Sequence, residues 1–128
     1  MVNELIPMNI DDVQAKVKKF IVDDKHFKIF SIIDQAAEAQ TANLTIPATR
    51  LIIFGNPKVG TLLMQQNDDI TFELPIKVLL IAQGANHTKV IYRDPYDFAG
   101  HDQLASGGQQ ILHKMHNMYR EMIAALQA

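Results

Sequence analysis

Two short, almost unbroken apolar runs constrain the fold of this chain more than any other feature of its sequence. One spans residues 50–54 and ends at Gly55, and the other spans residues 76–81 and follows Pro75. Apolar runs of this length, bounded by Gly or Pro, are typical of strands in the middle of a sheet. We therefore predict that these two segments form the centre of a sheet.

Two further segments are predicted to extend that sheet. Residues 26–32 alternate polar and apolar side chains like a half-buried strand. Residues 88–92 follow a loop at residues 83–86 that contains Gly and Asn, which is the strongest hairpin signal in the chain. The pair Asp94-Pro95 then ends the ladder, because proline cannot donate a hydrogen bond to it.

Helical patterns lie at both ends of the chain and between the strands. The first begins at the capping residue Asn9, and the last begins near Ser106. Asp34 is predicted to cap a short helix, and Pro57 suits the first position of another. The last helix has one apolar face, formed by Ile111, Leu112, Met115, Met118, Tyr119, Met122 and Leu126. Helices at both ends with strands between them predict one α+β domain over residues 1–128.

The composition argues against several classes of function. The formal net charge is −2, so the chain has no broad basic field and we expect no nucleic-acid partner. It contains no cysteine, which removes disulfides, thiolate nucleophiles and thiolate-bound metals. No basic and apolar leader opens the sequence, and no apolar run approaches the ~20 residues of a membrane span. We therefore expect a cytoplasmic protein without a membrane partner.

Three blocks of the sequence carry a resemblance to a known family. They read RLIIFGNPKVGT at residues 50–61, LPIKVL at residues 74–79 and YRDP at residues 92–95. The run LLM continues the first block, and His101 follows the third. Together they resemble the uncharacterised family DUF302, from Phe27 to Leu104. One departure is Gln35, where many relatives have a histidine, so no role of that histidine is transferred.

The resemblance implies a fold and no reaction. Members of the family are similar to a compact β-α-β(4)-α arrangement of the TATA-binding-protein-like class. In that arrangement, helices pack on one side of a curved, mainly antiparallel sheet. Related domains tend to form dimers, so we expect a homodimer, and the long apolar face of the last helix agrees with it. The family has no established reaction, and we expect neither a cofactor nor a metal.

The stretch from Gly55 to Gly60 is the first candidate site. It leaves a buried strand and enters a helix, where backbone amides without helical partners can bind an anion. We expect the amides of Lys58, Val59 and Gly60 to face a small anionic metabolite. Asn56 would orient that ligand, and Lys58 would add a full charge. The alternative is a structural turn, in which glycine permits an unusual backbone, asparagine caps the helix and proline starts it.

Tyr92, Asp94 and His101 form the second candidate site. Asp94 could orient His101 as a general base, with Tyr92 as a donor. The alternative is a turn opened by the Asp-Pro pair, beside a partly exposed histidine. His113 and His116 stand three residues apart, but on the polar side of the last helix, so we expect no metal between them.

These features leave three functions open. We predict a non-enzymatic module that binds a small ligand or a protein partner. One alternative is an enzyme of unknown reaction that uses the Gly-Asn-Pro-Lys turn with Asp94 and His101. The other is a purely structural interaction protein. The methionines of the last helix suit either a pliable ligand surface or core packing. Convergence of the two candidate sites on one pocket would favour a ligand or a substrate.

Overall fold

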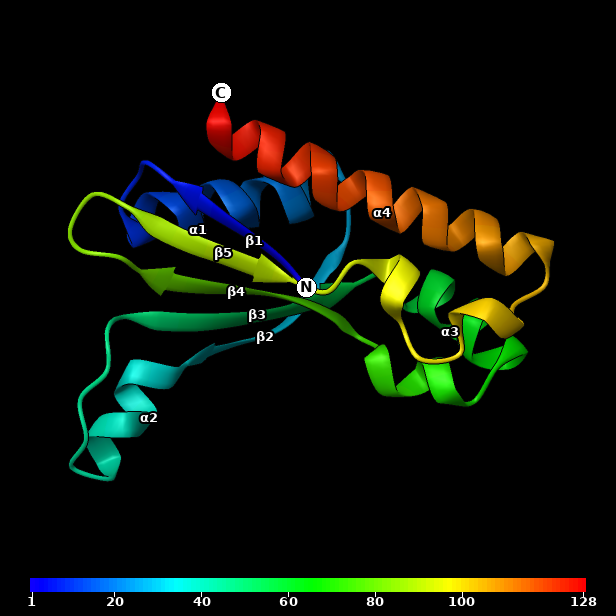
Figure 1. Cartoon of the computed structure of the whole chain (residues 1–128), viewed down its shortest axis with the longest axis horizontal. Coiled ribbons are helices and arrows are strands. Elements are labelled where there is room, and N and C mark those ends of the chain that lie inside the picture. Colours follow the sequence, from blue (N-terminus) through cyan, green and yellow to red (C-terminus); the bar gives the residue numbers. More distant parts are fainter.

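The chain forms a five-stranded antiparallel sheet whose order is β1-β5-β4-β3-β2 (Figure 1). The computed structural model describes residues 1–128. The strands are β1 (Val2–Ile6), β2 (Lys28–Asp34), β3 (Thr49–Gly55), β4 (Ile76–Ala82) and β5 (Thr88–Tyr92). The helices are α1 (Ile10–Lys19), α2 (Gln35–Thr41), α3 (Pro57–Gln66) and α4 (Ser106–Gln127). The predicted α+β arrangement with β-α-β(4)-α order is confirmed, with α2 and α3 inserted between strands.

Three of the helices begin at side-chain caps that the sequence predicts. The Asn9 side chain accepts a hydrogen bond from the amide of Asp12 at 2.9 Å, and Asp34 accepts one from Ala37 at 2.9 Å. Asn56 caps α3, whose first residue is Pro57. Each cap satisfies amides that the first helical turn would otherwise leave without partners.

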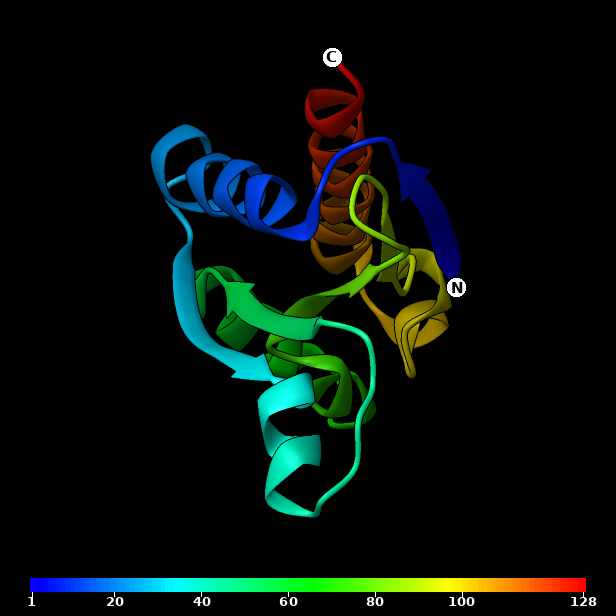
Figure 2. The ribbon, with the colours of Figure 1, turned by 90° about the vertical axis from the view of Figure 1, so that its left-hand side faces the viewer.

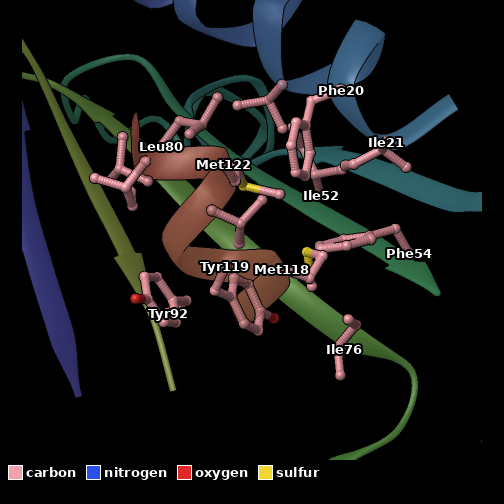
Figure 3. Close-up of a cluster of buried hydrophobic side chains, with 14 of the residues drawn as sticks. Phe20, Ile21, Ile52, Phe54, Ile76, Leu80, Tyr92, Met118, Tyr119 and Met122 are labelled. Carbon is pink, nitrogen blue, oxygen red and sulfur yellow. The ribbon is translucent and has the colours of Figure 1, made fainter. Parts of the chain in front are cut away.

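One face of the sheet carries the core, and α1 and α4 cover it. Figure 2 shows both helices on the concave side of the curved sheet, with α2 projecting away from them. The buried side chains labelled in Figure 3 come from the strands, from α4 and from the short helix η1 (Phe20–Asp24) that follows α1: Phe20, Ile21, Ile52, Phe54, Ile76, Leu80, Tyr92, Met118, Tyr119 and Met122. The apolar face of α4 is therefore largely core packing.

Tyr119 anchors α4 to the sheet from within this core. Its hydroxyl donates to the Lys77 carbonyl at 2.8 Å, and its ring stacks on Tyr92 with centroids 4.1 Å apart. Burial raises the pKa of the Tyr119 hydroxyl well above its usual range, so the group stays neutral.

The opposite face of the sheet carries a half-buried apolar row, with Lys77 and Lys89 on the same side of their strands. Ile33, Leu51, Leu79 and Ile91 occupy one row across four strands, through the pairs Ile33↔Leu51, Leu51↔Leu79 and Leu79↔Ile91. All four side chains are partly accessible. We call this surface the outer face.

The sequence analysis did not predict β1, although the strand alternates in the expected way. Ile6 is buried, whereas Leu5 is 58% exposed at the sheet edge. In the sequence, however, the charged Glu4 stands between Val2 and Ile6 on the same side of the strand, which breaks the period-two pattern of apolar residues. No helix of the structure combines the length and the apolar character that crossing a membrane would require.

Candidate functional site

The Gly55–Gly60 stretch forms the predicted strand-to-helix turn, and its own chain already uses the amides. The Asn56 Oδ1 atom accepts hydrogen bonds from the amides of Lys58 at 3.0 Å and Val59 at 3.4 Å. The Gly60 amide donates to the Asn56 carbonyl at 2.9 Å. An anion at these amides would therefore have to displace the Asn56 side chain. The local geometry is that of the structural alternative, a capped turn.

The same turn nevertheless borders a concave apolar surface, which we call the turn groove. It consists of two hollows of about 230 Å³ and about 370 Å³, which share Gly55, Asn56, Ile76 and Met115. The remaining apolar side chains of the groove include Phe27, Phe30, Val59, Leu62, Ile111 and Met118. Gly60 lines the first hollow, and Lys114 is the one cationic residue that lines either. Lys58 is exposed and lines neither.

Asp94 and His101 lie in the same segment without making the predicted contact. The Asp94 carboxylate instead meets His116 of α4, whose Nδ1 atom lies 3.0 Å from Oδ1 and 2.9 Å from Oδ2. The His101 amide donates to the Phe98 carbonyl, and its own carbonyl accepts from Gln109. Asp94 also accepts from the Tyr96 amide at 3.0 Å, which starts the short helix η3 (Pro95–Asp97).

Tyr96 holds the two histidines of α4 in different environments. Its ring stacks on the His116 ring with centroids 4.4 Å apart, and its hydroxyl contacts the Nδ1 atom of His113. Tyr96 therefore contacts both histidines, whereas Asp94 contacts His116. Nowhere in the chain do three His, Asp or Glu side chains gather closely enough to hold a metal. His116, placed on a solvated face by the sequence analysis, is 21% exposed.

Tyr92, Asp94 and His116 share a hollow of about 480 Å³ between β1 and α4, which we call the β1–α4 pocket. Glu4 of β1 and Arg120 of α4 also line it. Burial raises the pKa of the Tyr92 hydroxyl most, and the carboxylates of Asp94 and Glu4 raise it further. The Arg120 guanidinium acts in the opposite direction. These charged groups therefore surround the Tyr92 hydroxyl, which stays neutral near physiological pH.

A fourth hollow opens where β4 and β5 part. Their pairing ends at Leu79↔Ile91, and beyond it lies a mostly apolar slot of about 220 Å³. Arg93 and Glu73 at its edge face each other at 3.5 Å, and Glu73 also accepts from the Ala99 amide at 2.9 Å.

The two candidate sites of the sequence analysis thus line different hollows. Asn56 and Gly60 belong to the turn groove, Tyr92 and Asp94 belong to the β1–α4 pocket, and His101 lines none of the hollows described here. The sequence analysis missed the contact between Asp94 and His116, because the two residues are 22 positions apart. No local signal in the sequence links these two residues.

Comparison with known proteins agrees with the fold. The family model described as "Domain of unknown function DUF302" matches residues 3–125. The crystal structure of an uncharacterized conserved protein DUF302 from Bacillus stearothermophilus superposes with a TM-score of 0.77 at 13% identity. The superposition covers 98% of this chain and 94% of that one. This likeness is one of fold.

Longer curated proteins share part of the sequence. The fluoride-specific ion channel FluC 1 of Brucella suis biovar 1 is 38% identical over 86 residues, which are 67% of this chain and 32% of that protein. The fluoride-specific ion channel FluC 2 of Brucella melitensis biotype 1 is 38% identical over the same length, which is 30% of that protein. The chain therefore spans about a third of the length of the curated relatives it matches.

Proposed function

We propose that this chain, which belongs to the DUF302 family of domains of unknown function, is a non-enzymatic module that binds a small ligand in the turn groove. The observation that supports it is the groove itself, an apolar hollow on both sides of Met115 with few polar groups at its edges. Small-molecule sites have this character, since apolar walls supply affinity and a few polar groups fix orientation.

The polar groups of the turn groove suggest an acid with an apolar body. Lys114 has no carboxylate within 4 Å, so its ammonium is free for a ligand anion. The Asn56 Nδ2 atom makes no hydrogen bond within the chain and is a second donor. Met115 and Met118 give the groove flexible walls that adapt to an apolar group. Lys58, exposed beside the cap, is a further cation for the same anionic group.

Ligand-observed NMR tests the proposal with benzoate, phenylacetate, hexanoate and octanoate, each beside its neutral amide. We expect the acids to bind more tightly than the amides. Lys114→Gln should weaken binding by up to about fivefold, the scale of a solvent-exposed ion pair. Lys18→Gln removes an exposed cation from α1 and is the matched control.

Gly60→Leu supplies a variant that blocks the groove and should still fold. A Cβ atom at this position has room, since its nearest neighbour is a Leu74 side-chain atom at 4.0 Å. Leucine is also the better helix former, by roughly 1 kcal/mol. The variant should be at least as stable as the wild type and should bind the acids more weakly, because the added side chain fills the first hollow, which Gly60 lines. Equal binding by Gly60→Leu, or no binding of any acid by the wild type at millimolar concentration, would overturn the proposal.

The Brucella relatives add fluoride to the ligands that should be tested. They are named as fluoride-specific channels, and the segment they share with this chain is about a third of their length. We propose that this segment is a ligand-binding part of those proteins and that membrane crossing belongs to their remaining length. Fluoride titration of this chain, followed by the amide NMR spectrum, tests whether the domain itself binds the ion.

Location and assembly complete the proposal. We propose a cytoplasmic protein and a homodimer; subcellular fractionation and sedimentation test these two points. An enzyme remains the alternative function, and the contact between Asp94 and His116 is the observation that favours it.

A further inference from the structure

We propose that the β1–α4 pocket is a second ligand site and that it takes a small zwitterion of the amino-acid class. Such a molecule carries an ammonium and a carboxylate a few bonds apart. The pocket shares no lining residue with the turn groove, so the two sites can be tested separately.

Two opposite charges line this pocket without pairing. Glu4 is half-buried on β1, and Arg120 lies on α4. Neither makes an ion pair within 4 Å in the chain. A partly desolvated carboxylate without a cation is unfavourable, so a ligand ammonium at Glu4 would relieve that penalty. The guanidinium of Arg120 presents paired donors that match a ligand carboxylate.

Tyr92 adds a hydroxyl that has no partner in the protein and is accessible from the pocket. The residue is only 7% exposed, and its hydroxyl makes no hydrogen bond within the chain. Figure 3 shows the hydroxyl oxygens of Tyr92 and Tyr119 on opposite sides of the stacked pair. Because Asp94, Glu4 and Arg120 all act on the Tyr92 hydroxyl, that hydroxyl points toward the β1–α4 pocket. This hydroxyl can donate a hydrogen bond to a ligand carboxylate or accept one from a ligand ammonium.

His116 supplies a second oriented group in the same wall. Asp94 holds the Nδ1 atom of the imidazole, and Tyr96 packs against the ring, so the side chain has one orientation. The Nε2 atom makes no hydrogen bond within the chain. It can donate to a carboxylate when the ring is protonated, or accept from an ammonium when it is neutral.

The balance of charge selects a zwitterion over a simple ion. A plain anion would be attracted by Arg120 but repelled by the carboxylates of Glu4 and Asp94. A plain cation would be attracted by these carboxylates, but it would be repelled by Arg120 and would leave that guanidinium without a carboxylate. A molecule with both charges meets an opposite charge at each end. Ligands with a single charge are disfavoured, because the pocket group of like sign repels them.

Amide NMR titration of the wild-type chain with the common L-amino acids tests this inference. Each amino acid is compared with its N-acetyl form and its carboxamide, which each lack one charge. We expect at least one amino acid to bind, with signals of residues around Tyr92 and His116 shifting. Each blocked form should bind about tenfold more weakly, the effect of one charge-assisted hydrogen bond. Equal binding by a blocked form, or no binding by any amino acid at millimolar concentration, overturns the proposal.

Glu4→Gln and Arg120→Gln test the same point from the protein side. Glu4→Gln keeps side-chain size and Arg120→Gln keeps a shorter polar side chain. Each substitution should weaken binding of the amino acid by about tenfold. Lys114→Gln, at the turn groove, is the matched control and should leave this binding unchanged. Unchanged binding in Glu4→Gln or Arg120→Gln, or a loss of binding in Lys114→Gln, contradicts a site in the β1–α4 pocket. Because Arg120→Gln should leave the turn groove intact, failure of one site is distinguishable from failure of the other.

Discussion

Gly100 starts the short helix η4 (His101–Gln103) with a left-handed backbone, at φ 76° and ψ 4°. A Cβ atom at this position would overlap the side-chain amide of Asn67. That amide is already committed, because its oxygen accepts from Asp69 at 2.8 Å and Ile70 at 3.2 Å. Two independent requirements, the backbone conformation and the close approach, therefore specify glycine here.

Gly100→Ala should consequently destabilise the fold by about 2–4 kcal/mol, which combines the backbone strain with displacement of Asn67. Gly84→Ala separates the two contributions, because Gly84 has a φ of 74° but no atom within 4 Å of the added Cβ. The control should lose only about 1 kcal/mol, the cost of a left-handed alanine. Urea denaturation measures both. Equal urea midpoints for the two variants would show that the close approach of Asn67 adds no cost to an alanine at position 100.

At the scale of an element, one side chain caps the N-terminus of α3. Asn56→Ala removes the acceptor for the Lys58 and Val59 amides and should lower the free energy of unfolding by about 1 kcal/mol. Asn56→Asp keeps the acceptor and should retain most of that stability. Denaturant unfolding of the two variants beside the wild type measures the difference. An alanine variant as stable as the aspartate variant would mean that the cap does not stabilise α3.

At the scale of the whole molecule, the outer face of the sheet is the surface on which we predict a homodimer. The apolar face of α4 packs in the core of its own chain. It therefore does not support the dimer that the sequence analysis based on it. The outer face instead leaves the row from Ile33 to Ile91 partly accessible. Apolar patches of this kind commonly mark contacts between proteins.

Ile81→Lys places a charge on that outer face, next to the apolar row. We expect the wild type to sediment at twice the 14.4 kDa of one chain at micromolar concentration, and the variant at 14.4 kDa. Val22→Lys, at a side chain 44% exposed just after α1, is the control and should stay dimeric. A wild type that sediments only as a single chain would remove the dimer, and a dimeric Ile81→Lys would move the interface elsewhere.

The sequence by itself determined most of the elements, because the interactions that specify them are local. Asn9, Asp34 and Asn56 cap helices through amides within three residues of themselves. The apolar runs of β3 and β4 are typical of strands in the middle of a sheet. The family resemblance then supplied their order, and the structure confirms it.

The tertiary structure alone decided which side chains meet. Asp94 is closer in sequence to His101 than to His116, but the packing of α4 against η3 and β1 brings His116 to it. The same packing turns Glu4 and Arg120, at opposite ends of the chain, toward one pocket. Periodicity and capping act over a few residues, whereas a pocket depends on how distant elements pack. No local pattern in this sequence contains that information.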